Sequence, residues 1–201
     1  MSRILVLFAH PMLEKSRTQI MFLEAIGKLN KVYVHDLYQV YPHFDIDVAY
    51  EQELLKNHDI IVLQHPFYWY SAPPLIKQWI DLVLEHGWAY GKDGNQLKGK
   101  WLFHAISAGG PQMAYQEGGF NQFTIRQFLA PFEQTARLCK MHFLPPFVMH
   151  ATHRSGKNEI QTFASNYKTL LEGLAQEKYE LSTLSSANYL NDLLPGKAIQ
   201  A

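Results

Sequence analysis

Residues 3–18, RILVLFAHPMLEKSRT, decide the fold of this 201-residue chain. The apolar run at 4–9 is typical of a strand that is buried on both faces of a sheet. The run ends at His10-Pro11, and a polar loop without glycine leads to Ser16-Arg17-Thr18 and a helical pattern. A buried strand followed by a helix predicts the start of a parallel sheet whose crossovers are helical.

The same alternation continues along the chain. Further strands are expected at 32–38, 59–66, 101–110 and 141–150, and helices around 20–30, 49–58, 73–86, 123–140 and 158–177. We expect Pro131 to disturb its helix, and the paired prolines 145–146 to end the last strand or place it at the sheet edge. Five strands, each followed by a helical stretch, predict an α/β domain with a parallel sheet and helices on both faces.

Composition limits the class of protein. Apolar residues make up 47% of the chain and charged residues 18%, as in ordinary globular domains. Lys plus Arg equals Asp plus Glu, 18 each, which does not indicate a nucleic-acid partner. The single cysteine, Cys139, excludes an internal disulfide. We find no signal-peptide pattern and no run of about 20 apolar residues. We therefore expect a cytoplasmic protein that reaches the inner face of a membrane only through a partner.

Residues 1–180 are expected to form one domain. The segment 181–201 is rich in Ser and Asn and is weakly patterned. We expect it to be a loose extension, and an arm that docks a partner is the alternative.

Ligands of open parallel sheets bind at the carboxyl ends of the strands, where the topology switches direction. The first such end lacks the G-x-G-x-x-G pattern of a dinucleotide-binding turn, and GKDGNQLKGK (91–100) lacks the spacing of a P-loop. What remains is a hydroxyl-rich helix start at Ser16–Thr18, whose amides and side chains can face an anion. The alternative is that Ser16 serves only as a helix cap.

Two further strand ends carry unusual residues. Phe67, Tyr68, Trp69 and Tyr70 place four aromatic side chains on one loop. Three interpretations of these aromatic side chains are open: they pack on the core, they form a dimer contact, or they stack on a planar ring. After the fourth strand, Gly109-Gly110 allows close backbone approach to a ligand. Because the three strand ends converge, they predict a site for a planar ring that bears a phosphate.

The three loops resemble the flavin site of the flavodoxin-like NAD(P)H:quinone oxidoreductases, and more specifically their bacterial branch, the ancillary proteins of glutathione-regulated potassium-efflux systems. The resemblance covers about residues 3 to 155. The motifs that carry it are HDLYQVYPHFDID (35–47), VLQHPFYWYSAPPLIKQWID (62–81), HGWAYG (86–91), GNQLKGK (94–100), SAGG (107–110) and RLCKMHFLPPF (137–147). It implies a flavodoxin-like three-layer sandwich with strand order 2-1-3-4-5.

The resemblance also implies a role for each matching residue. The flavin phosphate would be held by His10, Ser16, Arg17 and Thr18. The ring edge would be lined by Pro66, Phe67, Tyr68, Trp69 and Tyr70. The pyrimidine side of the ring would meet Ser107, Gly109 and Gly110.

Three more residues take implied roles in catalysis and assembly. Tyr115 would support the charge that develops on the reduced flavin. Asn121 stands where mammalian relatives have a histidine as acid/base partner, and an Asn side chain cannot supply a proton. Tyr90 would reach the substrate pocket of a partner subunit, which implies a homodimer.

The implied activity is two-electron hydride transfer from NAD(P)H to flavin and then to a quinone, with ping-pong turnover. FMN is expected because the glycine-free loop suits a terminal monophosphate, and FAD is the alternative. The implied protein partner is the cytosolic domain of a potassium-efflux antiporter. The alternative is a regulatory subunit of that antiporter, with structural flavin and little turnover.

Other polar residues are expected to be structural. His150 and His153 lie three apart, but no carboxylate or thiol completes a metal site. His65 and His104 fall in apolar strands and are expected to be core histidines. Cys139 is expected to be a buried, inert thiol rather than a redox switch.

Overall fold

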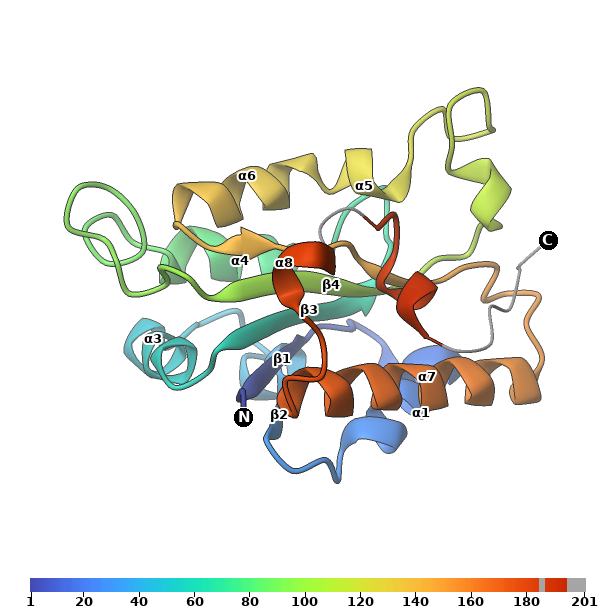
Figure 1. Ribbon diagram of the computed structural model, residues 1–201, viewed down its shortest axis with the longest axis horizontal. Coiled ribbons are helices and arrows are strands. Elements are labelled where there is room, and N and C mark those ends of the chain that lie inside the picture. Colours follow the sequence, from blue (N-terminus) through green and yellow to red (C-terminus); the bar gives the residue numbers. More distant parts are fainter. Residues whose placement is uncertain (185–186, 195–201) are drawn as a thin grey trace.

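The computed structural model describes residues 1–184 and 187–194 (Figure 1). Its centre is a parallel sheet made of β1 (Ile4–Phe8), β2 (Val32–Asp36), β3 (Ile60–Pro66), β4 (Trp101–Ser107), β5 (His142–Phe143) and β6 (Phe147–Met149). The strand order is β2-β1-β3-β4-β5, and β6 also pairs with β4. Since β5 and β6 lie one after the other along β4, they are two parts of one edge strand. The predicted order 2-1-3-4-5 is confirmed.

The paired prolines explain why the edge strand is split. Pro145 and Pro146 lie between β5 and β6 and have no backbone N–H to give to the ladder. Pairing with β4 stops after Phe143 and resumes at Phe147. Both expectations for these prolines are confirmed, because the first part of the strand ends before them and the strand lies at the edge.

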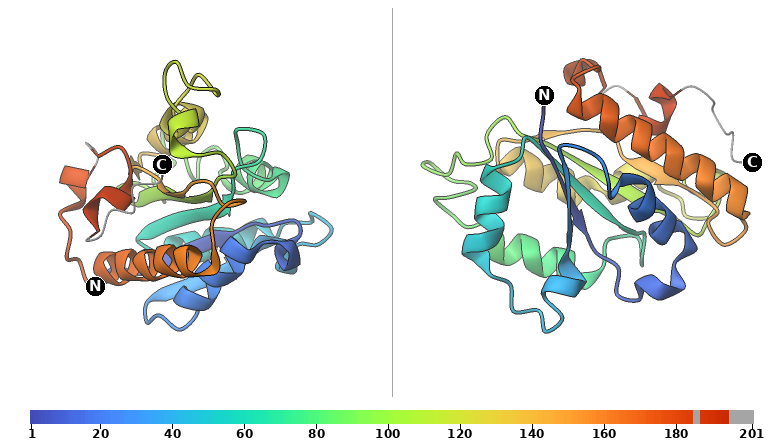
Figure 2. Two further views of the ribbon diagram at one scale, coloured as in Figure 1. Left: turned by 90° about the vertical axis from the view of Figure 1, so that its right-hand side faces the viewer. Right: turned by 90° about the horizontal axis from the view of Figure 1, so that it is seen from below.

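Helices cover both faces of the sheet (Figures 1 and 2). One face carries α1 (Arg17–Ile26) and α7 (Lys157–Ala175), which pack on Ile4, Val6 and Phe8 of β1. The other face packs on Leu5 and Leu7, and it carries α2 (Leu37–Val40), α3 (Val48–Lys56), α4 (Pro74–Val83), α5 (Ile125–Phe128) and α6 (Ala130–Leu138). Every residue of β1 is therefore buried, as its continuous apolar run predicts. None of the described helices has the length and apolar character that crossing a bilayer requires.

The helix predicted at 123–140 is two helices. α5 ends at Phe128, and Leu129 is both the C-cap of α5 and the N-cap of α6. Pro131 lies in that first turn, where its missing N–H has no intrahelical acceptor to lose. Pro131 therefore marks the start of a second helix and does not kink a continuous one. The predicted helix 73–86 also ends early, at Val83.

The motif HDLYQVYPHFDID (35–47) belongs to a buried polar cluster beside α3. Glu51 is fully buried, and its Oε1 accepts from Tyr41 Oη and lies 2.6 Å from His35 Nε2. Its Oε2 accepts from Trp79 Nε1 at 2.8 Å. A buried carboxylate requires such partners, so this motif serves the fold rather than the strand-end site.

The described part of the segment 181–201 packs on the domain instead of forming a loose extension. It contains α8 (Leu181–Leu184) and the 3-10 helix η3 (Leu190–Leu193), and it buries Leu184, Leu190 and Leu194 against the α1/α7 side of the core. The Asn191 side chain accepts from Val148 N–H at 2.8 Å and donates to Val148 C=O at 3.0 Å. One amide thus satisfies the outer edge of β6, which the weak pattern of the segment did not reveal. Residues 185–186 and 195–201 lie outside the described part of the chain.

We predict that Asn191→Ala lowers the free energy of unfolding by about 1–2 kcal/mol, because two hydrogen bonds to the edge strand are lost. Urea unfolding measures the difference. Asn158→Ala, at an exposed position of α7, is the matched control and should change stability by less than about 0.5 kcal/mol. Equal effects of the two substitutions would contradict a structural role for the C-terminal segment.

Candidate functional site

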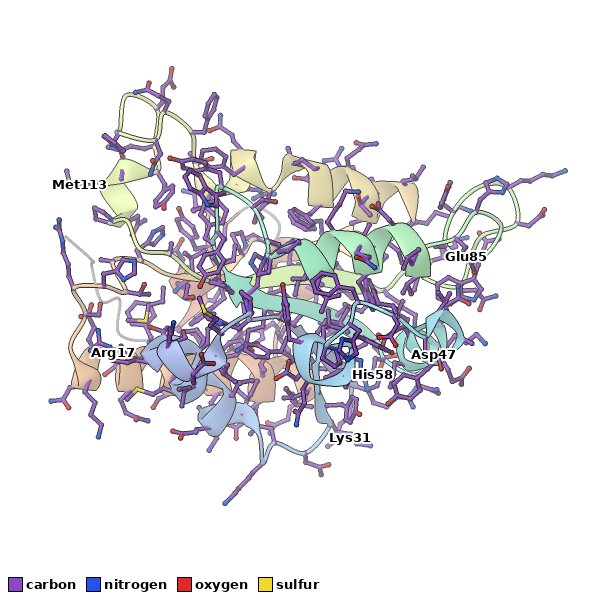
Figure 3. All side chains as sticks on the ribbon, turned by 180° about the vertical axis from the view of Figure 1, so that it is seen from behind. Arg17, Lys31, Asp47, His58, Glu85 and Met113 are labelled. Carbon is purple, nitrogen blue, oxygen red and sulfur yellow. The ribbon has the colours of Figure 1, made fainter. Side chains whose placement is uncertain are left out.

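A pocket of about 490 Å³ opens at the carboxyl ends of β1, β3 and β4. Figure 3 shows Arg17 and Met113 at this end of the molecule, with Glu85 at the opposite end. The pocket is lined by every residue predicted to bind the cofactor, namely His10, Ser16, Arg17, Thr18, Pro66, Phe67, Tyr68, Trp69, Tyr70, Ser107, Gly109, Gly110 and Tyr115. Sequence reasoning missed four lining residues, which are Met12, Lys15, Thr152 and His153.

One end of the pocket is built to receive an anion. Ser16 caps α1, since its Oγ accepts from Gln19 N–H at 3.2 Å, and it lines the pocket as well. Arg17 and Thr18 are the first residues of the helix, where backbone N–H groups have no intrahelical acceptor. Their N–H groups, the helix dipole and the Lys15 and Arg17 side chains all favour negative charge here. A terminal phosphate fits this set of donors.

His10 adds a neutral donor to the same end. Its Nδ1 accepts from Met12 N–H at 3.1 Å, so the neutral ring carries its hydrogen on Nε2. That nitrogen lies 3.5 Å from Tyr68 Oη, on the pocket wall. Burial lowers the pKa of His10, and the nearby Glu14 charge opposes the shift only in part. The side chain therefore favours hydrogen bonding over ion pairing with a ligand.

The aromatic loop after β3 divides into packed and exposed rings. Phe67 packs edge-on against Tyr115, and Tyr70 stacks on Phe128 with ring centroids 5.0 Å apart. Trp69 is 92% exposed beside the pocket. Trp69 and Tyr70 also have φ angles of 49° and 65°, which are uncommon without glycine and are disfavoured sterically. Packing on the core thus accounts for Phe67. Tyr70 stacks on Phe128 but is still 44% exposed, and Trp69 is left available to a ligand or to another chain.

A pair of buried histidines holds the turn into this loop. His65 Nδ1 lies 2.9 Å from Pro66 C=O, and His65 Nε2 lies 2.8 Å from His104 Nδ1. Since the carbonyl can only accept, His65 donates from Nδ1 and accepts at Nε2 from His104. Burial lowers the pKa of His65 to about 4 and the pKa of His104 well below its usual value. Both are neutral core histidines, as predicted.

The two glycines after β4 permit close packing within the chain. A Cβ atom on Gly109 would lie 2.7 Å from His153 Cδ2, and one on Gly110 would lie 3.1 Å from Tyr115 Cε2. Tyr115 is 7% exposed and lines the pocket. Burial raises the pKa of Tyr115, and a hydrogen bond with the Gly110 backbone opposes the shift. The phenol is therefore a neutral donor at neutral pH.

Tyr115 is supported from behind by residues that sequence reasoning did not place at the site. The His150 ring lies 5.6 Å from the Tyr115 ring, and Tyr189 lies edge-on to His150 at 5.6 Å. Burial lowers the pKa of His150 to about 4 and raises the pKa of Tyr189 to about 12. Because Tyr189 comes from the C-terminal segment, that segment forms the second layer of the pocket wall.

Two predicted residues do not line this pocket. Asn121 Oδ1 accepts from Tyr70 Oη at 3.3 Å, so Asn121 contacts the aromatic loop rather than the cavity with Tyr115. Tyr90 lies on the loop that joins α4 to β4, at the opposite end of the strands (Figure 1). Lys140 holds that loop, since its Nζ donates to the carbonyls of Gly91 and Gly94.

The described residues include neither a metal-ligand cluster nor a reactive thiol. Within residues 1–184 and 187–194, no three His, Cys, Asp or Glu side chains gather in a way that could hold a metal ion. Cys139 is buried as predicted, and burial raises its pKa to about 11.

Comparison with known proteins decides the family. Residues 2–172 match the family model described as flavodoxin-like fold. The chain belongs to the flavodoxin-like family. Among relatives, it is 44% identical over 174 residues to the glutathione-regulated potassium-efflux system ancillary protein KefG of Salmonella paratyphi B, covering 87% of this chain and 93% of that protein. The family resemblance predicted from the motifs is confirmed.

Two solved structures are similar to this chain over most of their length. General stress protein 14 of Treponema denticola, solved in complex with FMN, is 39% identical with a TM-score of 0.82, covering 86% of this chain and 99% of that one. The NADPH-quinone reductase of P. pentosaceus is 36% identical with a TM-score of 0.76, covering 86% of this chain and 97% of that one. The fold and the flavin-binding class are thus supported by structures as well as by sequence.

We predict that acid destabilises the protein steeply. Burial lowers the pKa of His65, His104 and His150 in the folded state, whereas the unfolded chain titrates near 6.5. The stability that these neutral side chains contribute is complete above pH 6.5 and is lost as the pH falls towards 4. Each adds about 1.4 kcal/mol per pH unit to the slope.

Urea unfolding at pH 7, 6 and 5 measures this slope. His150→Gln should reduce the slope by about 1.4 kcal/mol per pH unit, which is the contribution of one proton. His142→Gln, at an exposed position, is the control that should leave the slope unchanged. A free energy of unfolding that does not vary over this range would contradict the neutral state of the three histidines.

Proposed function

We propose that this chain binds FMN in the strand-end pocket and transfers reducing equivalents from NAD(P)H to a quinone. The observation that carries the proposal is the pocket itself, where the anion-binding start of α1 and an aromatic wall lie in one cavity of about 490 Å³. Similarity to an FMN complex and to an NADPH-quinone reductase supports it.

The residues present fit a flavin mononucleotide. The phosphate would be bound by Ser16, Arg17 and Thr18, and the ring would lie between the aromatic loop and the Ser107–Gly110 segment. A second nucleotide half would need a further anion site, so FMN fits better than FAD. When bound, the flavin accepts a hydride from a nicotinamide and gives it to an acceptor.

The protein contributes orientation and charge stabilisation. One open pocket serves both substrates, so NAD(P)H and quinone would occupy it in turn, which is ping-pong turnover. Tyr115 would donate a hydrogen bond to negative charge on the ring, and its raised pKa keeps it protonated. The Asn121 amide cannot supply a proton, so proton transfer through Tyr115 and Asn121 is not part of this proposal.

A homodimer completes the pocket in this proposal. Tyr90 lies at the end of the sheet opposite to its own pocket, and Trp69 is largely exposed beside it. A second copy related by a two-fold axis would bring its Tyr90 loop to the exposed aromatic wall. Gly94 keeps that loop compact, because a Cβ atom there would lie 2.1 Å from Tyr90 O.

The first test is reconstitution. The purified chain, incubated with FMN and desalted, should be yellow and should oxidise NAD(P)H only when a quinone is added. Released flavin identified by chromatography distinguishes FMN from FAD. A colourless chain after reconstitution with either flavin would reject the enzyme proposal.

Tyr115→Phe should lower kcat about 100-fold, because one preorganised donor to developing charge is removed. Trp69→Ala should raise the KM for quinone without changing stability, since this ring is exposed. Tyr33→Phe, on β2 far from the pocket, is the control and should have normal kinetics. Normal rates in both pocket variants would show that the site is misplaced.

A second function is favoured by the similarity to ancillary proteins of potassium-efflux systems. In this proposal the chain docks on the cytosolic domain of an antiporter, at the inner face of the membrane, and its flavin is structural. We predict that deletion of the chain lowers potassium efflux in cells that carry the antiporter. Tyr115→Phe should restore efflux fully if docking is sufficient. Failure of this variant to restore efflux would show that turnover is required, and unchanged efflux on deletion would reject docking.

A further inference from the structure

A chain of buried polar side chains runs from α7 to the pocket wall. The Tyr167 hydroxyl lies 3.0 Å from Gln64 Oε1, Gln64 Nε2 lies 2.9 Å from Gln19 Oε1, and Gln19 Nε2 lies 2.9 Å from Ser107 Oγ. Tyr167, Gln64 and Gln19 are fully buried and do not line the pocket. Ser107 is the one member that does, at 8% exposure.

These polar groups lie where apolar side chains would otherwise complete the core. Tyr167 contacts Phe22 and Phe147 in the layer between α1, α7 and the sheet. Burying two carboxamides there is unfavourable unless each is hydrogen-bonded, and the chain supplies those bonds in sequence. The hydrogen-bonded series ends at Ser107, on the wall of the pocket.

The direction of the chain follows from its buried end. Burial raises the pKa of Tyr167, so the phenol keeps its hydrogen. Among the described residues, Gln64 Oε1 is the acceptor that this hydrogen has. If both amides were reversed, the Tyr167 hydrogen would be buried without an acceptor, which is unfavourable. Tyr167 therefore donates to Gln64, Gln64 donates to Gln19, and Gln19 donates to Ser107.

This direction fixes the role of the Ser107 hydroxyl. Its oxygen accepts from Gln19 on the inner side, and its own hydrogen has no acceptor among the described residues, so it is available to a ligand in the pocket. We propose that Tyr167, Gln64 and Gln19 are positioning residues that hold the Ser107 hydroxyl as a hydrogen-bond donor to the bound flavin, and so favour the reduced form, which carries more negative charge. This inference rests on the proposed function.

The test compares the reduction potential of bound FMN, measured by equilibration with a reference dye, with its dissociation constant in the oxidised state. Ser107→Ala removes the donor and should lower the preference for reduced over oxidised FMN about tenfold, which is about 30 mV for a two-electron couple. Tyr167→Phe keeps the ring and frees the amides to reverse. It should lower the same preference about threefold.

A double variant separates positioning from general stability. If Tyr167 acts through Ser107, the double variant has the potential of Ser107→Ala alone. Tyr41→Phe is the matched control. It removes another buried hydroxyl, which donates to Glu51 and takes no part in the hydrogen-bonded series from Tyr167 to Ser107. Additive shifts in the double variant, or an equal shift in Tyr41→Phe, would overturn the positioning role.

A measurement without flavin keeps the two proposals distinguishable. The Tyr167 hydroxyl hydrogen should give a proton NMR signal in the FMN-free protein that exchanges slowly with water and is lost in Tyr167→Phe. Absence of this signal would overturn the direction assigned to the chain. If the wild-type protein shows the signal but binds no flavin, both the proposed function and the flavin role of Ser107 are rejected. Flavin binding with wild-type potentials in the variants would reject the positioning role alone.

Discussion

The pairing of β3 with β4 is the constraint on which the rest of the site depends. The two strands are in register from Ile60 opposite Trp101 to Pro66 opposite Ser107, and they lie in the middle of the sheet. Because successive side chains of a strand point to opposite faces, Gln64 faces α1 and α7 while His65 faces α6. The β3–β4 pairing therefore positions one directed series of hydrogen bonds on each face of the sheet, and both series lead to the pocket. The first ends at the Ser107 hydroxyl, and the second ends at the Pro66 carbonyl.

Both chains consist of neutral groups. Glutamine and phenol do not ionise near neutral pH, and burial keeps His65 and His104 uncharged. The charges at the site are instead carried by Lys15 and Arg17 at its exposed end. A site that stabilises charge on a ligand is stronger when its own interior is preorganised and uncharged, since no opposing charge then screens the donors. The arrangement of buried neutral donors and exposed cations suits an anionic ligand that enters from solvent.

The sequence revealed most of this site because its first layer lies at strand ends. The continuous apolar runs marked the strands, the topology brought their ends together, and each loop carried conspicuous residues such as Trp69 and Gly109. Thr152 and His153 follow the fifth strand, where the sequence carries neither a glycine pair nor an aromatic run that would mark a ligand-binding loop. The second layer could not be predicted. Contact between Gln19 and Ser107 depends on how α1 is rotated over the sheet, and the position of Tyr189 depends on a segment whose weak pattern gives no register.

The C-terminal segment joins two places that are otherwise separate. Asn191 occupies the outer side of β6 at Val148, and Tyr189, two residues earlier, packs on His150 behind Tyr115. Any partner that displaced this segment to add its own strand at β6 would also withdraw the second layer of the pocket wall. Occupancy of that edge and occupancy of the pocket would then be thermodynamically linked, and the linkage would act in both directions.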